Sequence, residues 1–236
     1  MEFKTASLMS GLDVLVGISG GKDSVVCLDL CCRFAHSVIG YFLYCFPQLS
    51  FQQDYLTYLS RRYRVIIEQY PHPARSFRLH HGLYRKEALP EIPKIGFKDI
   101  WETLKAHHPG RYFVVGEKKN DSLARRGKLS RWGNFQKERG WLFPLADWTN
   151  RDVLLYMRQR GLPLPPDYGR LGLRTSFGGL EGLELSKLEK EYPDDYAKII
   201  AEFPFVKAVQ FRDLKISRLP RRYHLPKQDH GGPIQS

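Results

Sequence analysis

Short apolar runs and helical spacings of apolar residues alternate along the first two thirds of the chain. Four apolar runs predict buried strands, at residues 13–18, 38–46, 64–70 and 111–117. A fifth strand is predicted at 141–147, where Pro144 interrupts it. Apolar residues recur at helical spacing in the segments between and after these runs, at 24–36, 51–62, 97–108 and 150–160. The chain is therefore predicted to alternate strands with helices.

This alternation predicts the fold class. Strands that alternate with helices indicate an α/β fold, a doubly wound and mainly parallel five-stranded sheet with helices on both faces. In such a sheet, ligands bind beyond the carboxyl ends of the strands. We therefore expect three loops to lie together at that edge, at residues 19–24, about 45–52 and 116–126.

The pattern changes after Gly161, where a Pro- and Gly-rich connection replaces the alternation. A helix is predicted over 182–203, with Pro193 starting a second helical piece. Beyond about Gln228 we expect a poorly ordered tail. These features divide the chain into a nucleotide-binding domain, residues 1–180, and a helical extension with a basic, partly disordered tail, residues 181–236.

The composition is that of a soluble globular protein. The chain has 236 residues, of which 42% are hydrophobic and 26% are charged. No apolar stretch approaches the roughly 20 residues that span a bilayer, and the N-terminal segment lacks the pattern of a signal peptide. Four cysteines crowd into one early segment, which is not a disulfide framework. We expect a cytoplasmic protein without a membrane partner.

The net charge of +12 is distributed unevenly. Residues 117–139 carry eight Lys/Arg and three Asp/Glu, and residues 212–227 carry six Lys/Arg and one Asp. Residues 181–202, by contrast, carry three Lys and seven acids. Two interpretations stay open: the basic side chains keep the protein soluble, or one or both basic segments face a polyanion such as a nucleotide or nucleic acid.

The hexapeptide SGGKDS at residues 19–24 follows the first predicted strand and leads into a helix. Gly20 and Gly21 permit a tight turn and a close approach of the backbone to a ligand. Ser19 and Ser24 add hydroxyl groups, Lys22 adds a positive charge, and the helix N-terminus favours anions. Asp23 is suited to cap the helix or to contact Mg²⁺. The segment therefore predicts a site for a phosphate or pyrophosphate.

The same six residues resemble the pyrophosphate loop of the PP-loop ATP pyrophosphatase superfamily, which includes tRNA-thiolating enzymes, GMP synthetase, the small subunit of ATP sulfurylase and PAPS reductase. The resemblance implies that Ser19, Gly20, Gly21, Lys22, Asp23 and Ser24 bind an adenine nucleotide. It also implies that Lys22 and Asp23 act in catalysis, with Asp23 contacting Mg²⁺.

A second motif, GEKKNDSLAR at residues 116–125, resembles a segment of PAPS reductases and related sulfate-nucleotide proteins. Gly116, Ser122 and Arg125 match that segment, while Lys118 and Lys119 stand where the family usually has Arg. The resemblance implies that these residues hold a second anionic group, for which Lys lacks the bidentate geometry of Arg. A third segment, residues 144–157, resembles a structural element of the same branch.

The chain also departs from that branch. PAPS reductases use a Cys near the C-terminus, and some relatives carry further Cys for an iron–sulfur cluster, whereas this chain has no Cys after Cys45. We therefore expect no iron–sulfur cluster and no thiol-based reduction unless a protein partner supplies the thiol. Cys27, Cys31 and Cys32 are interpreted as small apolar residues of the first helix, and Cys45 as the one thiol near the expected ligand.

Three functions stay open. The first is an enzyme that cleaves ATP to AMP and pyrophosphate and adenylylates an unknown acceptor, in sulfur or nucleic-acid modification chemistry. The second is a protein that binds PAPS or a similar sulfonucleotide and has lost the redox Cys. The third is a non-catalytic module that binds nucleic acid or a protein partner and retains a nucleotide site. Aromatic residues near the two basic segments favour the third: Trp132, Phe135 and Tyr223.

Overall fold

The computed structural model describes residues 2–163 and 185–208 of the chain. These residues form a six-stranded sheet in the order β3-β2-β1-β4-β6-β5. Every neighbouring pair is parallel except β5 and β6, which are antiparallel. The strands are β1 (Asp13–Ile18), β2 (Ser37–Tyr44), β3 (Ile67–Pro71), β4 (Tyr112–Val114), β5 (Phe135–Gln136) and β6 (Trp141–Leu142). The predicted mainly parallel α/β fold is confirmed.

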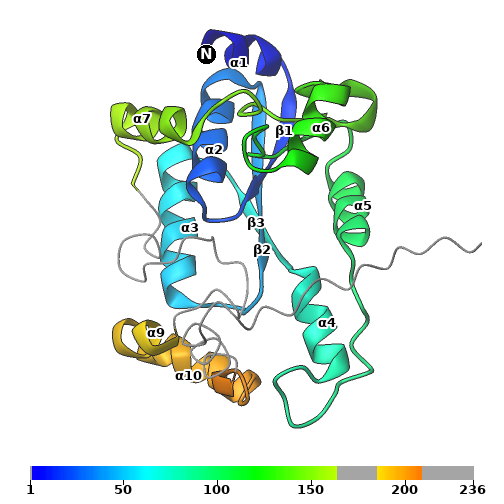
Figure 1. Cartoon of the computed structure of the whole chain (residues 1–236), viewed down its shortest axis with the longest axis vertical. Helices are drawn as coiled ribbons and strands as arrows, with labels where there is room; N and C mark the ends of the chain where they lie inside the picture. Colours follow the sequence, from blue (N-terminus) through cyan, green and yellow to red (C-terminus); the bar gives the residue numbers. More distant parts are fainter. Residues whose placement is uncertain (1, 164–184, 209–236) are drawn as a thin grey trace, which may run out of the picture.

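Helices cover both faces of the sheet (Figure 1). They are α1 (Glu2–Met9), α2 (Lys22–Phe34), α3 (Ser50–Tyr63), α4 (Pro73–His81), α5 (Phe97–His107), α6 (Leu123–Trp132), α7 (Asn150–Arg160), α9 (Leu185–Glu191) and α10 (Pro193–Glu202). Side chains along a strand point alternately to the two faces. Val14 and Val16 of β1 accordingly pack in a cluster with α2, α3 and α7, while Leu15 packs with Ile100 and Leu104 of α5.

Several predicted helix boundaries are confirmed by their caps. Thr149 caps the start of α7 by accepting a hydrogen bond from the Asp152 backbone N–H at 3.2 Å, and Gly161 ends the helix with a φ of 57°. Pro193 separates α9 from α10 and occupies the first turn of α10, as the sequence predicted.

The prediction of five strands is wrong, because the structure adds β5. This strand has two residues and pairs antiparallel with β6, so it is too short to produce a periodic pattern. The strand expected at 141–147 is reduced to Trp141–Leu142, before Pro144. Helices α1, α4 and α6 were also not predicted.

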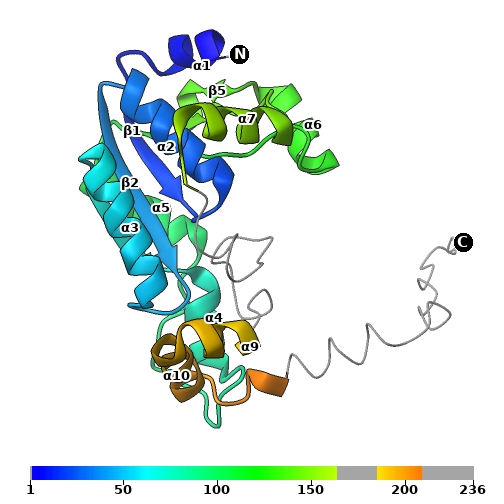
Figure 2. The same ribbon diagram turned by 90° about the vertical axis from the view of Figure 1, so that its left-hand side faces the viewer.

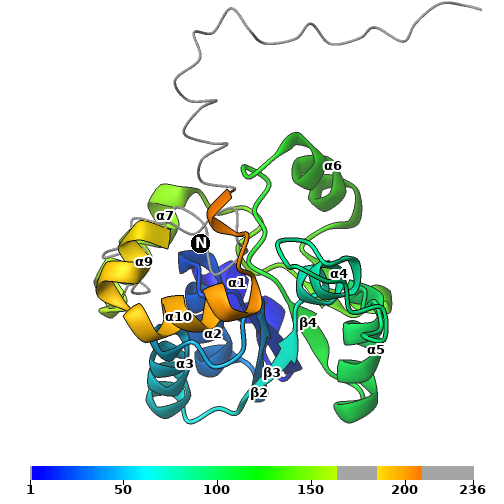
Figure 3. The same cartoon turned by 90° about the horizontal axis from the view of Figure 1, so that it is seen from below.

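The C-terminal helices α9 and α10 lie beside α3, at the end of the molecule away from α1 (Figures 2 and 3). Asp195 of α10 has no exposed surface and accepts hydrogen bonds from the Ser50 hydroxyl at 2.8 Å and the Phe51 backbone N–H at 3.3 Å. Burial alone would raise the pKa of Asp195, but these bonds and one from Lys198 outweigh it and lower the pKa. A carboxylate of α10 therefore stabilises the N-terminus of α3.

Several sequence expectations lie outside the described residues. They are the connection after residue 163, the basic segment 212–227 with Tyr223, the tail beyond Gln228 and the domain boundary at residue 180. Within the described part of the chain, no helix combines the length and the apolar character that crossing a membrane requires.

Candidate functional site

The loop between β1 and α2 adopts the tight turn that its glycines predict. Gly20 has a φ of 73°, a conformation that disfavours residues with a side chain. Gly21 is the N-cap of α2 in extended conformation, with a φ of −81° and a ψ of 156°, and the helix begins at Lys22. The positive end of the α2 dipole therefore faces the loop, as an anion site requires.

Two serines fix the shape of this loop. The buried Ser24 hydroxyl donates to the Gly21 carbonyl at 2.8 Å and accepts from the Ser19 backbone N–H at 3.2 Å. The Ser19 hydroxyl accepts from the Gly21 backbone N–H at 3.4 Å. Ser24 thus holds the loop closed on itself, while Ser19 lies exposed at its edge.

The second predicted motif lies directly against this loop. It follows β4, and Ser122 caps α6 by accepting from the Arg125 backbone N–H at 3.2 Å. A Cβ on Gly116 would stand 3.1 Å from the carbonyl carbon and from the Cβ of Asp23. Glycine at position 116 therefore lets the two loops approach each other, as the sequence predicted for loops at the same sheet edge.

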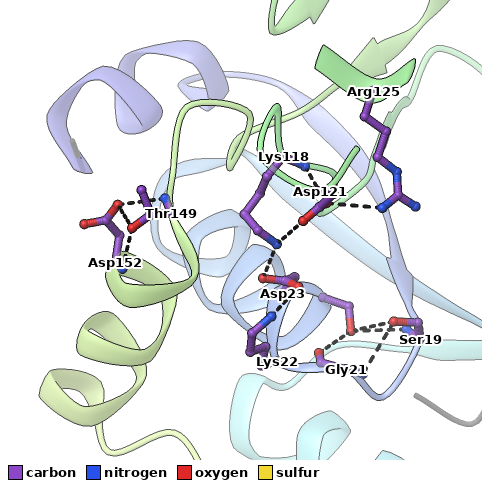
Figure 4. A network of polar contacts seen from close by, with 10 residues as sticks. Ser19, Gly21, Lys22, Asp23, Lys118, Asp121, Arg125, Thr149 and Asp152 are labelled. Atoms are coloured by element: carbon purple, nitrogen blue, oxygen red, sulfur yellow. Dashed lines mark hydrogen bonds and ion pairs between the residues drawn. The ribbon is translucent and has the colours of Figure 1, made fainter. Parts of the chain in front are cut away.

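Lys118 joins the two loops through carboxylates (Figure 4). Its Nζ lies 2.8 Å from Oδ1 of Asp23 and 3.1 Å from Oδ1 of Asp121, and its side chain is 1% exposed. Lys22 Nζ approaches the other oxygen of Asp23 at 2.8 Å. Lys118 is thus a buried ion-pair partner in this structure, and its predicted contact with a ligand stays a prediction.

Asp121 is the member of this network that sequence reasoning missed. It accepts a hydrogen bond from the Lys118 backbone N–H at 2.9 Å. Burial would raise the pKa of Asp121, but the hydrogen bonds from Lys118 and the charges of Lys118 and Arg125 outweigh it and lower the pKa. Its position three residues after Lys118 was the available signal, since a short turn brings such side chains together.

The two remaining predicted cations lie in different surroundings. Arg125 Nη1 lies 3.3 Å from Asp121 Oδ2, and the side chain is 46% exposed. Lys119 Nζ instead lies 2.6 Å from Oδ1 of Asp147, in the segment before α7. The structure therefore brings Arg125 to the site and pairs Lys119 with a separate segment.

A cleft of about 230 Å³ opens between the two loops. Ser19, Ser24 and Gly116 lie in its wall, together with three carboxylates and one guanidinium: Asp23, Glu117, Asp121 and Arg125. Lysines pair with these carboxylates: Lys22 and Lys118 with Asp23, Lys118 with Asp121, and Lys128 with Glu117. The cleft therefore offers both carboxylate oxygens, which suit a divalent cation, and cations, which suit phosphate.

The third loop expected at this sheet edge, residues 45–52, follows β2 there but is covered by the C-terminal helices. Cys45 and Phe46 are buried, and the Phe46 ring meets Phe203, which follows α10, with centroids 5.5 Å apart. Because β2, β1 and β4 are neighbouring parallel strands, the three loops follow strand ends at one edge of the sheet, as predicted, but no residue of 45–52 is in the wall of the cleft. The apolar side chains after β2 are covered by the C-terminal helices, which the local sequence could not indicate.

The cysteines of α2 have the properties of core residues. Cys27 and Cys31 are fully buried, and burial raises the pKa of each thiol well above its ordinary value. Burial also raises the pKa of Cys32 to about 12, with the nearby Asp29 charge as a second cause. Thiols that stay protonated are poor nucleophiles, which supports the structural interpretation of these three residues.

Several solved structures are similar to the chain. NMN synthetase from Francisella tularensis has a TM-score of 0.51 and 13% identity over 95% of this chain and 97% of that chain. NH3-dependent NAD synthetase from Campylobacter jejuni has a TM-score of 0.48 and 11% identity over 93% and 96%. The U34-tRNA thiolase NcsA from Methanococcus maripaludis has a TM-score of 0.46 and 17% identity over 89% and 77%.

The NcsA structure corrects one sequence expectation. It contains a [4Fe-4S] cluster, so the expectation of no iron–sulfur cluster is wrong as an inference from this fold, and we withdraw it. The expectation relied on the lack of Cys after Cys45, whereas cluster ligands can come from other parts of a chain. Among the described residues, no group of three or more His, Cys, Asp or Glu is arranged to hold a metal ion.

The sequence itself places the chain in a family. No curated protein matches it. The family model of the phosphoadenosine phosphosulfate reductase domain matches residues 13–173, which begin with β1 and include both loops of the cleft. This match confirms the resemblance to the PAPS reductase-like branch of the PP-loop superfamily. The chain therefore belongs to the phosphoadenosine phosphosulfate reductase domain family.

Proposed function

We propose that the chain binds ATP with its phosphates in the cleft and cleaves it between the α- and β-phosphates. An acceptor oxygen attacks the α-phosphorus, pyrophosphate leaves with the electrons of the broken bond, and the acceptor becomes adenylylated. The observation that carries the proposal is the junction of the two loops. The anion-type turn at residues 19–24 and the loop at 116–125 form one cleft, joined by Lys118, Asp23 and Asp121.

Lys22 is the cation that we assign to the leaving group. It is the first residue of α2, beside the N–H groups that point at the loop, and its Nζ pairs with Asp23. A phosphate at the helix N-terminus would attract Lys22 away from that carboxylate. Because negative charge grows on the leaving pyrophosphate, a fixed ammonium and backbone N–H groups stabilise the transition state more than the bound ATP.

Magnesium fits the donor set of this cleft. Mg²⁺ is usually held by one or two carboxylates together with phosphate oxygens and water. Asp23 and Asp121 both line the cleft, and the described residues supply no larger ligand group of their own. We assign Asp23 as the magnesium contact, as the family resemblance implies. The bound ion would supply positive charge at the phosphates, and Lys118 would hold Asp23 in place.

The products test this function. We expect incubation with ATP, Mg²⁺ and the acceptor to release pyrophosphate and to leave the AMP group on the acceptor, from which hydrolysis frees AMP; ³¹P NMR distinguishes these products from ADP and phosphate. Since the acceptor is unidentified, a cell extract depleted of proteins serves as its source. Lys22→Ala is the matched control, because it removes the proposed contact with the leaving group. Release of ADP and phosphate would contradict the proposal.

Binding of a sulfonucleotide is the second candidate, and the position of Arg125 favours it. This side chain lines the cleft and is half exposed, so it can meet an additional phosphate or sulfate. The lack of Cys after Cys45 excludes a reductive step carried by a Cys of the later chain. In this case the protein would hold the nucleotide and depend on a partner for the thiol.

Arg125→Ala tests the anion preference. We expect the substitution to lower the affinity for adenosine 3′,5′-bisphosphate by about tenfold more than the affinity for AMP, because only the bisphosphate carries a second phosphate group. Isothermal titration calorimetry with both ligands measures the difference. Lys119→Ala is the matched control and should change neither affinity, since Lys119 pairs with Asp147. Equal losses for both ligands would contradict this role of Arg125.

We also propose three further features: the division of the chain at residue 180, a cytoplasmic location, and a nucleic-acid or protein partner.

The basic segment 117–139 gives only part of its charge to a polyanionic partner, because four of its cations are paired with carboxylates: Lys118, Lys119, Arg125 and Lys128. Its other cations are exposed and pair with no carboxylate among residues 2–163 and 185–208: Arg126, Arg131, Lys137 and Arg139.

A further inference from the structure

Five charged side chains form a line of alternating sign across the two loops of the cleft (Figure 4): Lys22, Asp23, Lys118, Asp121 and Arg125. Asp23 presents Oδ1 to Lys118 and Oδ2 to Lys22, each at 2.8 Å. Asp121 presents Oδ1 to Lys118 at 3.1 Å and Oδ2 to Arg125 at 3.3 Å. All four carboxylate oxygens therefore face a cation of the chain, so a metal ion that binds to any of them displaces or approaches one of these cations.

The burial of the three cations shows which of them can move. The Lys118 side chain is 1% exposed, and the oxygen of Asp23 that it meets is buried. Breaking a buried ion pair leaves a charge without compensation, which costs far more than breaking an exposed pair. The two cations at the ends of the line, Lys22 and Arg125, are 16% and 46% exposed. Because Asp23 is the proposed metal contact, Lys22 is the cation that has to leave it.

Lys22 occupies an unfavourable position for a cation when the cleft is empty. It is the first residue of α2, where the positive end of the helix dipole lies, and its ion pair with Asp23 offsets that charge. A phosphate at the same helix end carries more negative charge than a carboxylate and accepts hydrogen bonds from the free backbone N–H groups. Lys22 therefore has a better partner once a phosphate is bound.

We propose that Lys22 couples the binding of the metal ion to the binding of the nucleotide phosphates. This inference rests on the proposed function. In the empty cleft, the Lys22 ammonium pairs with Oδ2 of Asp23 and repels a divalent cation from that oxygen. A bound phosphate draws Lys22 to itself and frees the oxygen for the metal ion.

Neither ligand is well accommodated alone. A metal ion without phosphate displaces Lys22 and leaves the ammonium without a counter-charge. A phosphate without metal takes Lys22 and leaves the Asp23 carboxylate facing a second negative group. When both bind, every charge is compensated, so each ligand raises the affinity for the other by the same factor. The ion pair between two adjacent residues thus keeps the cleft from binding free metal ions tightly.

Titration with Mn²⁺ in the absence of nucleotide tests the inference. Mn²⁺ takes the same oxygen ligands as Mg²⁺, and electron paramagnetic resonance measures the unbound ion. Lys22→Met removes the competing ammonium, so we expect it to lower the Kd for Mn²⁺ by at least about tenfold. The same substitution should raise the Kd for ATP. Opposite changes in the two affinities distinguish coupling from a loss of structure, which would weaken both.

Three further variants serve as controls. Lys22→Arg keeps the positive charge and should bind Mn²⁺ as weakly as the wild type. Lys22→Met combined with Asp23→Asn should lose the gain, because the ion would bind at Asp23. Lys119→Met should leave the Kd for Mn²⁺ unchanged, since Lys119 pairs with Asp147 and neither residue is in the wall of the cleft. If Lys22→Met does not fold, Lys22→Gln takes its place.

Two results would overturn the inference: a Kd for Mn²⁺ in Lys22→Met equal to that of the wild type, or a gain in Mn²⁺ affinity that persists when Asp23 is replaced by Asn. The Mn²⁺ titrations contain no nucleotide, so they are independent of ATP binding. A gain at Asp23 in a protein that fails to bind ATP would support the competition between Lys22 and the metal ion and reject the proposed function. ATP binding without such a gain would reject the coupling and leave the proposed function standing.

Discussion

Replacement of Lys118 by Met is expected to lower the free energy of unfolding by about 3 kcal/mol. Methionine keeps the unbranched side chain except for its last atom and removes the ammonium, so Asp23 and Asp121 lose the charge between them. The Lys118 side chain is 1% exposed, while the two carboxylates are 27% and 19% exposed and retain some solvation. The loss should therefore lie at the lower end for a buried ion pair. Urea denaturation, monitored by circular dichroism, measures this loss in the free energy of unfolding.

Lys119→Met is the matched control. Lys119 and Asp147 form an ion pair at the surface, with side chains 31% and 56% exposed, so its loss should cost less than about 1 kcal/mol. Lys118→Met and the wild type should also differ in how their stability changes in acid. Because the pKa of Asp121 is lowered in the folded protein, its stabilisation is present above the pKa of the unfolded chain and is lost as the pH falls. Lys118→Met should lose less stability in acid than the wild type. Equal stability of Lys118→Met and Lys119→Met at neutral pH would contradict the stabilising role of the ion pairs between Lys118 and the two carboxylates.

Gly21→Val is expected to weaken ATP binding by at least about 100-fold. Gly21 is in the extended conformation that valine readily adopts, so the backbone is not strained. The added side chain would occupy the space where a phosphate approaches the start of α2. Titration calorimetry with ATP and Mg²⁺ measures the loss, and a thermal melt monitors folding.

Gly127→Val is the matched control, because a Cβ at Gly127 would meet no atom within 4 Å. ATP affinity in this variant should equal that of the wild type. Gly21 is buried, so valine also reduces stability. If Gly21→Val does not fold, Lys22→Ala replaces it, with a smaller expected loss. Unchanged ATP affinity in folded Gly21→Val would show that this loop does not hold the phosphates.

The sequence predicted the parts of the site that depend on local structure. An apolar run followed by SGGKDS predicts a strand, a turn and a helix N-terminus, and β1, Gly20 and α2 have this arrangement. Gly116 was predicted beside the loop because strand ends of a parallel sheet meet at one edge, and a Cβ at this position would stand 3.1 Å from Asp23. These inferences succeeded because short-range patterns determine turns, caps and strand ends.

Features that depend on tertiary packing could not be predicted in this way. The motif at 116–125 suggested a row of cations, but Lys118 is buried between carboxylates and Glu117 and Asp121 line the cleft. The segment after β2 suggested a place at the site, but α10, about 150 residues later, packs on it through Asp195. A cavity of about 440 Å³ is lined by Tyr41 of β2, Trp101 of α5, Trp132 of α6 and Trp141 of β6, which no local motif connects.

Calorimetric titration of the wild-type protein tests the central claim most directly, namely that the cleft binds ATP through metal-bound phosphates. Three titrations use the same protein: ATP with Mg²⁺, ATP with EDTA, and adenosine. We predict one-site binding of magnesium–ATP, with adenosine at least about 100-fold weaker and ATP in EDTA at least about tenfold weaker. Equal affinity for adenosine and ATP, or ATP binding that EDTA leaves unchanged, would contradict the account.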